Sequence, residues 1–578
     1  MRHRRSAGIV TGEGEGPDAR SDLLVRRLAG PRHPSRDVSS KEVVEAHLRQ
    51  IAEGGWPVAL ETVALNLADL SRQQAAIWPE RIALTFEGAA STYQDLDHRA
   101  THVANGLLAL SHAVQSRIAL LDKNSDAFYE LWFGAAKARK VVVPVNWRLA
   151  PAEIAYLIND AAAEVLFVGA AFLPVISQIR DELDTVKRIV ALSGMHAEWE
   201  SYRDWRDRQA AVDPCLVTPS EDVTIQVYTS GTSGHPKGAE ITNANLYAAR
   251  AVASELYPCR PDDVNLACMP QFHVTGSLAG LFGLESGART IIMREAAPAE
   301  ILRLIPSERV TIAAVVPALL RVMLQTPGSR EVDFTSLRHI TYGAAPIAED
   351  LLREALTTFK CDFAQAYGLT ETTGMVAVLP PRDHASVVNH RLRSCGRPLS
   401  NVAVKIVGYD GVELRPGEVG EVVVRSPLTM KGYWRQAEAT ASAIRDGWLH
   451  TGDAGYVDAD GYLYIHDRVK DMIVSGGENV YPAEVENVLS GHPAVADVAA
   501  IGVPDAGWGE AVKAVVVLRA MRPATESELI AYCRDRIAHY KAPKSVDFIE
   551  SLPRNPSGKV LKRVLRAPYW AGHERQVN

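Results

Sequence analysis

Long apolar segments are missing from this sequence. No run of hydrophobic residues approaches the roughly 18 that a membrane-spanning helix needs. The basic start of the chain, MRHRRSAGIVTGEGEGPD, also lacks the apolar stretch of a secretory signal. We therefore expect a soluble, cytoplasmic protein without a transmembrane segment, and peripheral contact with a membrane stays open.

Cysteine and positive charge are also scarce. The chain has six scattered cysteines and no CxxC pair, which argues against a disulfide framework or a zinc site and suits reduced thiols. Its formal net charge is −7, whereas broad nucleic-acid binding requires an excess of basic residues. We expect no nucleic-acid partner.

Length predicts more than one domain. A chain of 578 residues, 47% hydrophobic and 23% charged, is too long for one ordinary core. Residues 1–36 are rich in Arg, Gly and Pro without periodicity, whereas Ser39 and Glu42 form a capping box before a short helix. We expect a partly disordered N-terminal extension with one helix over residues 1–61, and its role stays open.

Alternating strands and helices begin near residue 62. Thr92 to Asp95 caps a helix with one apolar stripe, and the apolar runs 117–121, 141–145 and 164–169 are each followed by helical sequence. Continuous apolar strands between helices predict parallel sheets covered by helices. The fold class expected is α/β, with a large N-terminal domain of helix-covered, mainly parallel sheets over 62–466. A hinge over 467–471 and a small, mobile α+β domain over 472–578 follow.

A glycine-rich segment, YTSGTSGHPKG over residues 228–238, stands between an apolar run and helical sequence. Its glycines let backbone amides turn toward an anion, its hydroxyls donate, and Lys237 adds a positive charge. It is not a Walker A loop, because no Ser or Thr follows Lys237. The residues expected to hold polyphosphate are Thr229, Ser230, Gly231, Thr232, Ser233, Gly234 and Lys237.

This segment resembles the signature of the adenylate-forming family, which includes acyl-CoA synthetases, peptide-synthetase adenylation domains and firefly luciferase. The resemblance continues in order over roughly residues 62–565 and looks strongest to bacterial fatty-acyl-CoA ligases. Family members usually have Thr where Ser233 stands and often His where Asn243 stands. The resemblance implies that 62–466 is the adenylation domain and 472–578 its lid.

Further motifs imply a nucleotide and metal site. YGAAP, at 342–346, resembles the loop along the adenine ring, and YGLTE, at 367–371, resembles the motif that stacks on adenine, contacts the α-phosphate and holds Mg²⁺. Asp453 and Arg468 resemble the ribose clamp. The residues so implied are Gly343, Ala344, Ala345, Tyr367, Gly368, Thr370, Asp453 and Arg468, with Glu371 as the magnesium ligand.

The small domain resembles the family's moving lid. Lys470 stands at the hinge position, and Lys559, in PRNPSGK, at that of the lysine that steadies charge during adenylation. The residues implied to line a tunnel for the pantetheine arm of coenzyme A are Ser475, Gly476, Gly477, Glu478 and Trp508. The implied substrates are ATP and coenzyme A, with Mg²⁺ as cofactor.

By position in the family, the acyl pocket draws on His273, Val274, Gly276, Ser277, Gly280, Val316, Tyr342, Gly343, Gln365 and Met375. The small residues among them predict an open, elongated cavity. No acidic or basic residue stands out to bind an amino group, which favours hydrophobic acids. His273 either gates the carboxylate end of the pocket or is a structural histidine at a strand end, and both interpretations stay open.

The sequence therefore predicts an AMP-forming acyl-CoA synthetase, an acid–thiol ligase of lipid metabolism. It would convert a hydrophobic acid, first of all a medium- or long-chain fatty acid, to acyl-AMP and then to acyl-CoA. The alternatives are a ligase that loads an acyl carrier protein, a ligase for aromatic or steroid side-chain acids, and a luciferase-like oxygenase. A non-catalytic binding protein is disfavoured because Lys237, Glu371, Asp453, Arg468 and Lys559 are all present. The physiological acid and the oligomeric state, a homodimer included, stay open.

Overall fold

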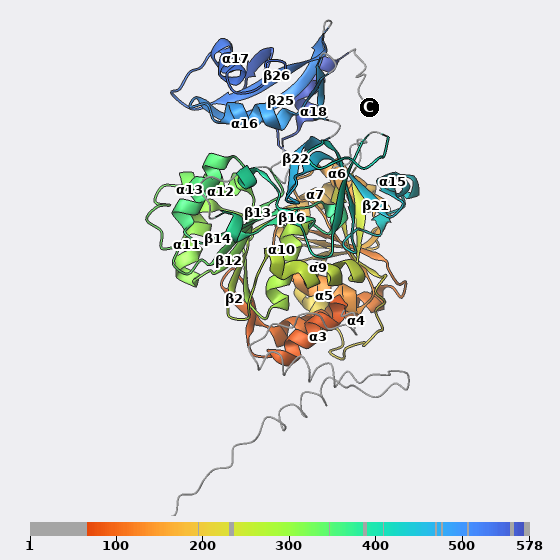
Figure 1. The fold of residues 1–578 in the computed structure, drawn as a ribbon. Helices are drawn as coiled ribbons and strands as arrows, with labels where there is room; N and C mark the ends of the chain where they lie inside the picture. The colour runs from red at the N-terminus through yellow and green to blue at the C-terminus, as the bar shows by residue number, and fades with distance from the viewer. Residues whose placement is uncertain are drawn as a thin grey trace, which may run out of the picture.

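A computed structural model describes residues 66–571 except 195, 230–235, 346, 385–389, 409, 469–470, 476–477, 506–507 and 555–559. The extension expected over residues 1–61 lies outside the described residues. A large domain with three sheets carries a small domain with a fourth sheet above it (Figure 1). This two-domain α/β architecture agrees with the predicted fold class.

The first sheet of the large domain has nine strands. In spatial order they are β16 (Arg397–Pro398), β15 (Ala377–Leu379), β14 (Asp362–Tyr367), β13 (His339–Gly343), β12 (Ile312–Val315), β10 (Val264–Ala267), β11 (Arg289–Ile292), β1 (Ile82–Phe86) and β2 (Ala89–Thr92). The strands from β14 to β1 are parallel, and β15, β16 and β2 pair antiparallel at the edges.

The second sheet has eight strands and a parallel centre. In order they are β19 (Gly432–Tyr433), β9 (Lys237–Thr242), β8 (Val223–Thr229), β4 (Val141–Pro144), β3 (Arg117–Leu121), β5 (Ala163–Val168), β6 (Arg188–Ala191) and β7 (Glu200–Ser201). The three apolar runs predicted as strands form β3, β4 and β5. The sequence prediction missed β9, which returns antiparallel to β8 before helix α9 (Asn243–Leu256) begins.

Helices cover both of these sheets. In the large domain they are α3 (Leu67–Ile77), α4 (Tyr93–Leu110), α5 (Ala127–Lys137), α6 (Pro151–Asp160), α7 (Leu173–Gln178), α8 (Tyr202–Asp207), α9, α10 (Val274–Glu285), α11 (Pro298–Glu308), α12 (Pro317–Gln325), α13 (Glu349–Phe359), α14 (Pro381–His384) and α15 (Ala437–Ala443). The predicted cap of α4 is present, because Thr92 and Asp95 exchange side-chain and backbone hydrogen bonds. Among the described helices, none combines the length and hydropathy needed to cross a bilayer.

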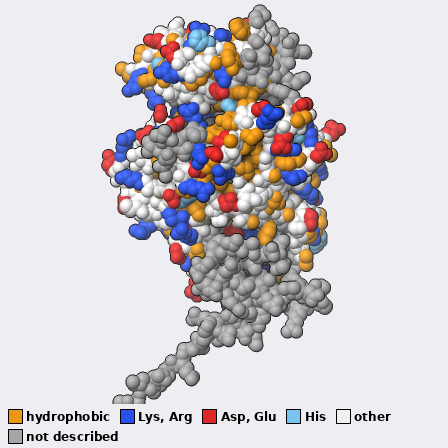
Figure 2. All heavy atoms as spheres, viewed as in Figure 1, with side chains coloured by type: hydrophobic (Ala, Val, Ile, Leu, Met, Phe, Trp, Pro, Cys, Tyr) orange, Lys and Arg blue, Asp and Glu red, His pale blue; other side chains and the backbone are white. Residues whose placement is uncertain are grey.

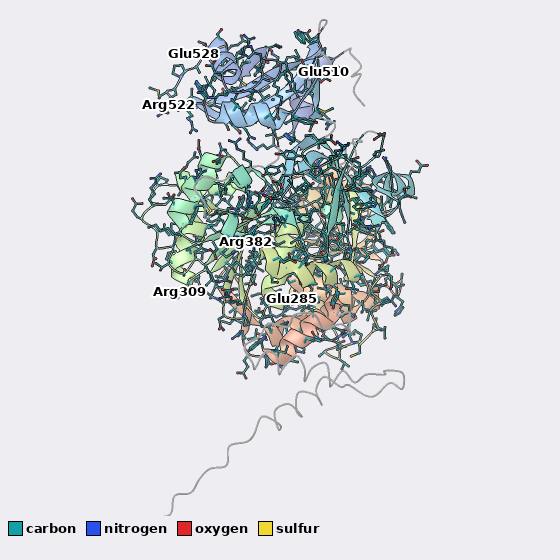
Figure 3. The ribbon with its side chains drawn as sticks, viewed as in Figure 1. Glu285, Arg309, Arg382, Glu510, Arg522 and Glu528 are labelled. Carbon is teal, nitrogen blue, oxygen red and sulfur yellow. The ribbon has the colours of Figure 1, made fainter. Side chains whose placement is uncertain are left out.

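Helix α10 forms the centre of the core. Its residues are apolar or small all round, and nearly all of them are buried, as expected for a helix enclosed on every side. It packs against β10, β11 and β12 of the nine-stranded sheet. Glu285 at its end, labelled in Figure 3, accepts from Arg250 of α9 at 2.6 Å, which ties the two helices together.

A third sheet differs from the expected parallel pattern. It is antiparallel and consists of β17 (Ala403–Val407), β18 (Gly420–Arg425), β21 (Trp448–Val457), β20 (Ile444–Arg445) and β22 (Leu463–Arg468). Its strands mix buried and half-exposed positions without a regular alternation, and local sequence does not distinguish such segments from loops. This sheet leads through β22 into the small domain.

The small domain has its own core and a five-stranded sheet. Its strands are β24 (Glu478–Val480), β23 (Ile473–Ser475), β26 (Gly509–Leu518), β25 (Val495–Asp505) and β27 (Ser545–Phe548), and its helices are α16 (Pro482–Ser490), α17 (Glu526–Arg534) and α18 (Lys562–Trp570). The predicted Pro-started helix and the strand at 511–518 correspond to α16 and β26. In Figure 1, α16, β25 and α18 lie on the side of the small domain that faces the large one.

Candidate active site

One continuous cleft of about 2530 Å³ runs between the two domains and into the large one. On the large-domain side it is lined at the carboxyl ends of the parallel strands β12, β13 and β14. Ligands of open α/β sheets bind outside these strand ends, because the loops there converge. Acidic and basic side chains are interspersed over the visible face of both domains (Figure 2), in keeping with the small net charge.

The predicted phosphate loop lies at the tip of the β8–β9 hairpin. Thr229 at the end of β8 pairs with Lys237 at the start of β9, and both line the cleft. Residues 230–235, which include Ser230, Gly231, Thr232, Ser233 and Gly234, lie outside the described residues. The hairpin therefore places the ends of this segment, and the Lys237 ammonium, at the cleft.

Glu371 and Lys237 both contact the side chain of Tyr433. The phenol of Tyr433 donates to Glu371 Oε1 at 2.8 Å, and the Lys237 ammonium lies 5.1 Å from the centre of the same ring. Tyr433 reaches this position because β19 pairs with β9, and the backbone amide of Met430 donates to the Glu371 carbonyl at 2.9 Å. A carboxylate and an ammonium are thus held at one end of the cleft by strand pairing.

Tyr367 and Asp453 join two other predicted parts of the site. The Tyr367 phenol donates to Asp453 Oδ2 at 2.6 Å, although the residues come from β14 and β21. Asp453 is buried, and its backbone amide donates to Thr451 Oγ1 at 3.0 Å. Arg468 lies opposite Asp453 in the β21–β22 register. The ring expected at adenine and the carboxylate expected at the ribose are therefore neighbours.

The turn after β13 lies close to the end of β14. A Cβ at Gly343 would stand 2.2 Å from the Ala366 carbonyl oxygen, so no larger residue fits there without moving the strand. Ala344 follows in a left-handed conformation with φ of 63°, which is uncommon for a residue with a side chain. Gly343, Ala344, Ala345, Gly368 and Thr370 all line the cleft.

His273 lines the cleft at the start of α10. Burial, with a contribution from the Arg148 charge, lowers the pKa of this imidazole to about 4, so it is neutral near pH 7. Among the described residues, its Nε2 has no hydrogen-bond partner. A buried polar atom without a partner, at a cleft, is suited to contact a ligand.

Most of the residues predicted to form the acyl pocket line the cleft, and two do not. Val274, Gly276, Val316, Tyr342, Gln365 and Met375 line the cleft. The described lining does not include Ser277 or Gly280, which differs from the predicted pocket. Ser277 donates to the Gln271 carbonyl at 2.6 Å, and a Cβ at Gly280 would stand 1.8 Å from the phenol oxygen of Tyr129. Their small size permits close packing of α10 and does not widen the cavity.

The small domain turns one edge toward the cleft. Arg554, Val560, Lys562, Arg563 and Arg566 line it, and an isolated bridge pairs Arg554 with Val560. Lys559 comes between these two residues in the sequence but is not among the described residues. The same holds for Lys470, Gly476 and Gly477. The side chains of Arg468 and Glu478 also lie outside the described part of the chain.

Two residues expected at the coenzyme A tunnel lie away from this edge. Ser475 is buried in the small-domain sheet opposite Gly509. Trp508 is half exposed, with the Lys544 ammonium 4.8 Å from its ring centre. Neither belongs to the described lining of the cleft.

Sequence reasoning missed several residues of the cleft. Tyr433 donates to Glu371, and Tyr257 and Phe282 line the cleft among other apolar side chains. The signal for Tyr433 was the aromatic pair in KGYWR, and the signal for Phe282 was its position on α10. Neither signal names a contact partner, because the partners are far away in sequence.

Fold and site define a two-domain nucleotide-binding enzyme of the α/β class. The ends of the β8–β9 hairpin, the Glu371 carboxylate and the Tyr367–Asp453 pair share one cleft with apolar side chains. The chain belongs to the AMP-binding enzyme family, whose model matches residues 71–434, and the model of the AMP-binding enzyme C-terminal domain matches residues 484–559. The predicted resemblance to adenylate-forming enzymes and the predicted enzyme class are confirmed.

Known relatives agree with this membership. The chain is 41% identical over 506 residues to a fatty acid–[acyl-carrier-protein] ligase of Streptomyces coeruleorubidus, covering 86% of this chain and 96% of that protein. It is 38% identical over 509 residues to a long-chain-fatty-acid–CoA ligase of Mycobacterium tuberculosis, covering 88% and 99%. A solved structure of a Mycobacterium tuberculosis fatty acyl CoA synthetase superposes with a TM-score of 0.71 at 37% identity, covering 88% and 99%.

Proposed function

We propose that this protein activates a hydrophobic carboxylic acid with ATP and transfers the acyl group from the acyl-adenylate to coenzyme A. The observation that carries the proposal is the single cleft that joins a phosphate and adenosine site to an apolar pocket. A carboxylate at the mouth of that pocket would meet the α-phosphate held by the hairpin. The two half-reactions then share one location.

In the first half-reaction, a carboxylate oxygen of the acid attacks the α-phosphorus, and the bond from that phosphorus to the β-phosphate oxygen breaks. Lys237 and the donors of the 230–235 segment would stabilise the phosphate charge, and Lys559 the charge that develops on the reacting groups. Neutral His273 can donate or accept one hydrogen bond at the carboxylate end of the pocket without adding charge. Pyrophosphate leaves, and the acyl-adenylate remains.

Magnesium fits Glu371. Among the described residues, no group of three or more His, Cys, Asp or Glu side chains could hold a metal by itself, whereas one carboxylate in the cleft suits an ion that phosphate oxygens also ligate. Tyr433 holds that carboxylate in place at 2.8 Å. When bound there, the ion would neutralise phosphate charge.

In the second half-reaction, the small domain would rotate near Lys470 and bring Gly476 and Gly477 to the cleft, as hinge motions do in many enzymes. The thiolate of coenzyme A would attack the acyl carbonyl carbon, and the bond from that carbon to the AMP oxygen would break. Ser475 and Trp508 lie outside the described cleft lining. This supports the interpretation that the small domain, as described, is oriented for adenylation and not for thioester formation.

The pocket supports a hydrophobic acid. Its walls are mostly apolar: Leu256, Tyr257, Val274, Leu278, Ala279, Phe282, Ala314, Val315, Val316 and Met375. Two polar groups beside these walls are already paired, since Tyr257 donates to Asn265 at 2.5 Å and Thr341 to the Leu256 carbonyl at 2.7 Å. An apolar chain packed against them would leave both hydrogen bonds in place. A medium- or long-chain fatty acid fits these walls, and an aromatic acid is the second candidate.

The test measures release of AMP and pyrophosphate over a panel of acids, with coenzyme A, with a phosphopantetheinylated carrier protein, and with neither. We expect acid-dependent release that coenzyme A accelerates and that is greatest for apolar acids. Acceleration by the carrier protein alone would replace coenzyme A as the acceptor, an alternative supported by the Streptomyces relative. Release independent of the acid would overturn the proposal.

A further inference from the structure

Strand β25 carries a β-bulge on the side that faces the large domain. In the β25–β26 ladder, Val495 pairs with Leu518 and Asp497 with Val517, so the register shifts at Ala496. The extra residue of a bulge drops out of the ladder, and its backbone groups need other partners. Both Ala496 and Asp497 line the cleft between the domains.

The large domain supplies the missing partner. Arg321 on α12 donates from Nη1 to the Ala496 carbonyl oxygen at 2.8 Å. This guanidinium also lines the cleft, on the opposite domain. In Figure 1, α12 lies to the left of β22 at the top of the large domain, so the Arg321 contact is not at the connection that β22 makes to the small domain. A contact far from a hinge moves most when the domain rotates, and it therefore reports and restrains that rotation.

From the bulge, a short series of contacts leads to the loop of the adenylation lysine. Asp497 accepts from Arg554 at 2.6 Å. Arg554 in turn pairs with Val560 across the isolated bridge, and the amide of Leu561 donates to the Pro553 carbonyl at 2.8 Å. The base of the 554–560 loop is thus fixed to the bulge, and the bulge to α12.

Near the connection of the two domains at β22, the contacts are of another kind than that of Arg321. His466 Nδ1 lies 3.7 Å from Glu484 Oε1, and its ring centre lies 4.8 Å from that of Tyr481. Residues so close to the hinge can keep their neighbours over a range of rotations. The Arg321 contact cannot, because a single hydrogen bond fails when its atoms separate by more than about 1 Å.

We propose that Arg321 is a positioning residue for adenylation: it binds the bulge of β25 and so holds Arg554 and Val560, which flank Lys559 in the sequence, at the cleft. The contact must break before the second half-reaction, when the small domain turns away. The inference rests on the proposed function, because it assigns Arg321 to one of its two half-reactions. It names an interdomain contact by a side chain outside the nucleotide, metal and acyl sites.

The experiment separates the half-reactions in the full-length protein. We expect Arg321→Ala to lower acid-dependent pyrophosphate–ATP exchange about tenfold, the usual effect of losing a charge-assisted hydrogen bond. Thioester formation from supplied acyl-adenylate and coenzyme A should stay the same or become faster. Arg321→Lys should keep most of the exchange activity, because one ammonium donor suffices for one carbonyl. Arg330→Ala is the matched control, since Arg330 forms an exposed ion pair with Glu354 within the large domain.

A distance measurement provides a readout that a merely structural role would not change. Dyes on the exposed native Cys215 and on Met521→Cys, 98% exposed in the small domain, report domain orientation in a Cys361→Ser background. We expect Arg321→Ala, with ATP and acid present, to depopulate the orientation described above. Equal loss of both half-reactions, no loss in either, an alanine-like Arg321→Lys, or an unchanged distance distribution would each overturn the inference. If the unaltered protein showed no exchange at all, the proposed function itself would fail instead.

Discussion

The phenol of Tyr367 donates to the carboxylate of Asp453 at 2.6 Å, which links β14 to β21 at the cleft. The two residues come from different sheets, the nine-stranded sheet and the antiparallel one. The proposed adenosine site therefore depends on how these two sheets are packed, and not on one loop alone.

Removing this phenol tests that dependence. Tyr367→Phe keeps the ring for stacking but loses a hydrogen bond to a charged group, so we expect the KM for ATP to rise about tenfold. The KM for the acid should stay nearly constant. Tyr540→Phe, at an exposed position of the small domain, is the control. A change in acid affinity with unchanged ATP affinity would contradict the assignment.

The bond from Tyr433 to Glu371 makes a prediction about magnesium. Tyr433→Phe removes the phenol that donates at 2.8 Å but keeps the ring beneath Lys237. We expect the Mg²⁺ concentration for half-maximal exchange to rise several-fold, because the carboxylate loses the group that orients it. Glu371→Gln should raise it further. A magnesium response identical to that of the unaltered protein in both variants would exclude Glu371 as the ligand.

Lys559 is predicted to act in one half-reaction. Lys559→Ala should lower adenylation at least ~10²-fold, because the charge that develops during phosphoryl transfer loses its cation. Thioester formation from supplied acyl-adenylate should survive. Single-turnover assays of the two steps check this, with Lys187→Ala, an exposed lysine paired with Glu164 in the large domain, as the control. Equal losses in both steps would contradict the role.

His273 makes a prediction about acid stability. Its folded pKa of about 4 lies below the ordinary value of about 6.5, so the unfolded chain binds the extra proton between these pH values. The free energy of unfolding is therefore highest, as far as His273 is concerned, above pH 6.5, where the ring is neutral in both states. It decreases by up to about 1.4 kcal/mol per pH unit as the pH falls toward 4. His339, with a pKa of about 4, adds to the same trend.

Replacing the ring should reduce this slope. The thermal midpoint of His273→Gln should fall less steeply between pH 6.5 and 4 than that of the unaltered protein. The exposed His112 serves as a control through His112→Gln, which should leave the slope as it is. A slope unchanged in His273→Gln would mean that folding does not lower the pKa of His273, which would contradict this account.

Local patterns predicted the local parts of the fold. The capping box at Thr92, the apolar strands β3, β4 and β5 and the Pro-started helix α16 are each encoded within a few residues. The antiparallel third sheet and β9 were not predicted, although many of their pairs join consecutive strands, because their short or irregular burial patterns do not distinguish them from loops. Glu240 of β9, for example, looks like a surface residue but forms an ion pair with Arg117 at 2.6 Å, largely buried.

The site divides in the same way. Motif residues such as Tyr367, Glu371 and Asp453 were predicted and lie together in the cleft. The roles of Tyr433 and Arg321 depend on contacts that only the fold creates. The small size of Gly280 was interpreted as free space, whereas the Tyr129 phenol occupies it. Composition alone cannot distinguish a residue that lines a cavity from one that allows two elements to pack closely.

The most direct test is exchange of labelled pyrophosphate into ATP by the purified full-length protein with Mg²⁺ and without coenzyme A. If carboxylate attack on the α-phosphate is the chemistry of this cleft, label enters ATP when an apolar acid is added and fails to enter when the acid is omitted. An absence of exchange with every acid offered, in protein that is folded and binds ATP, would contradict the account.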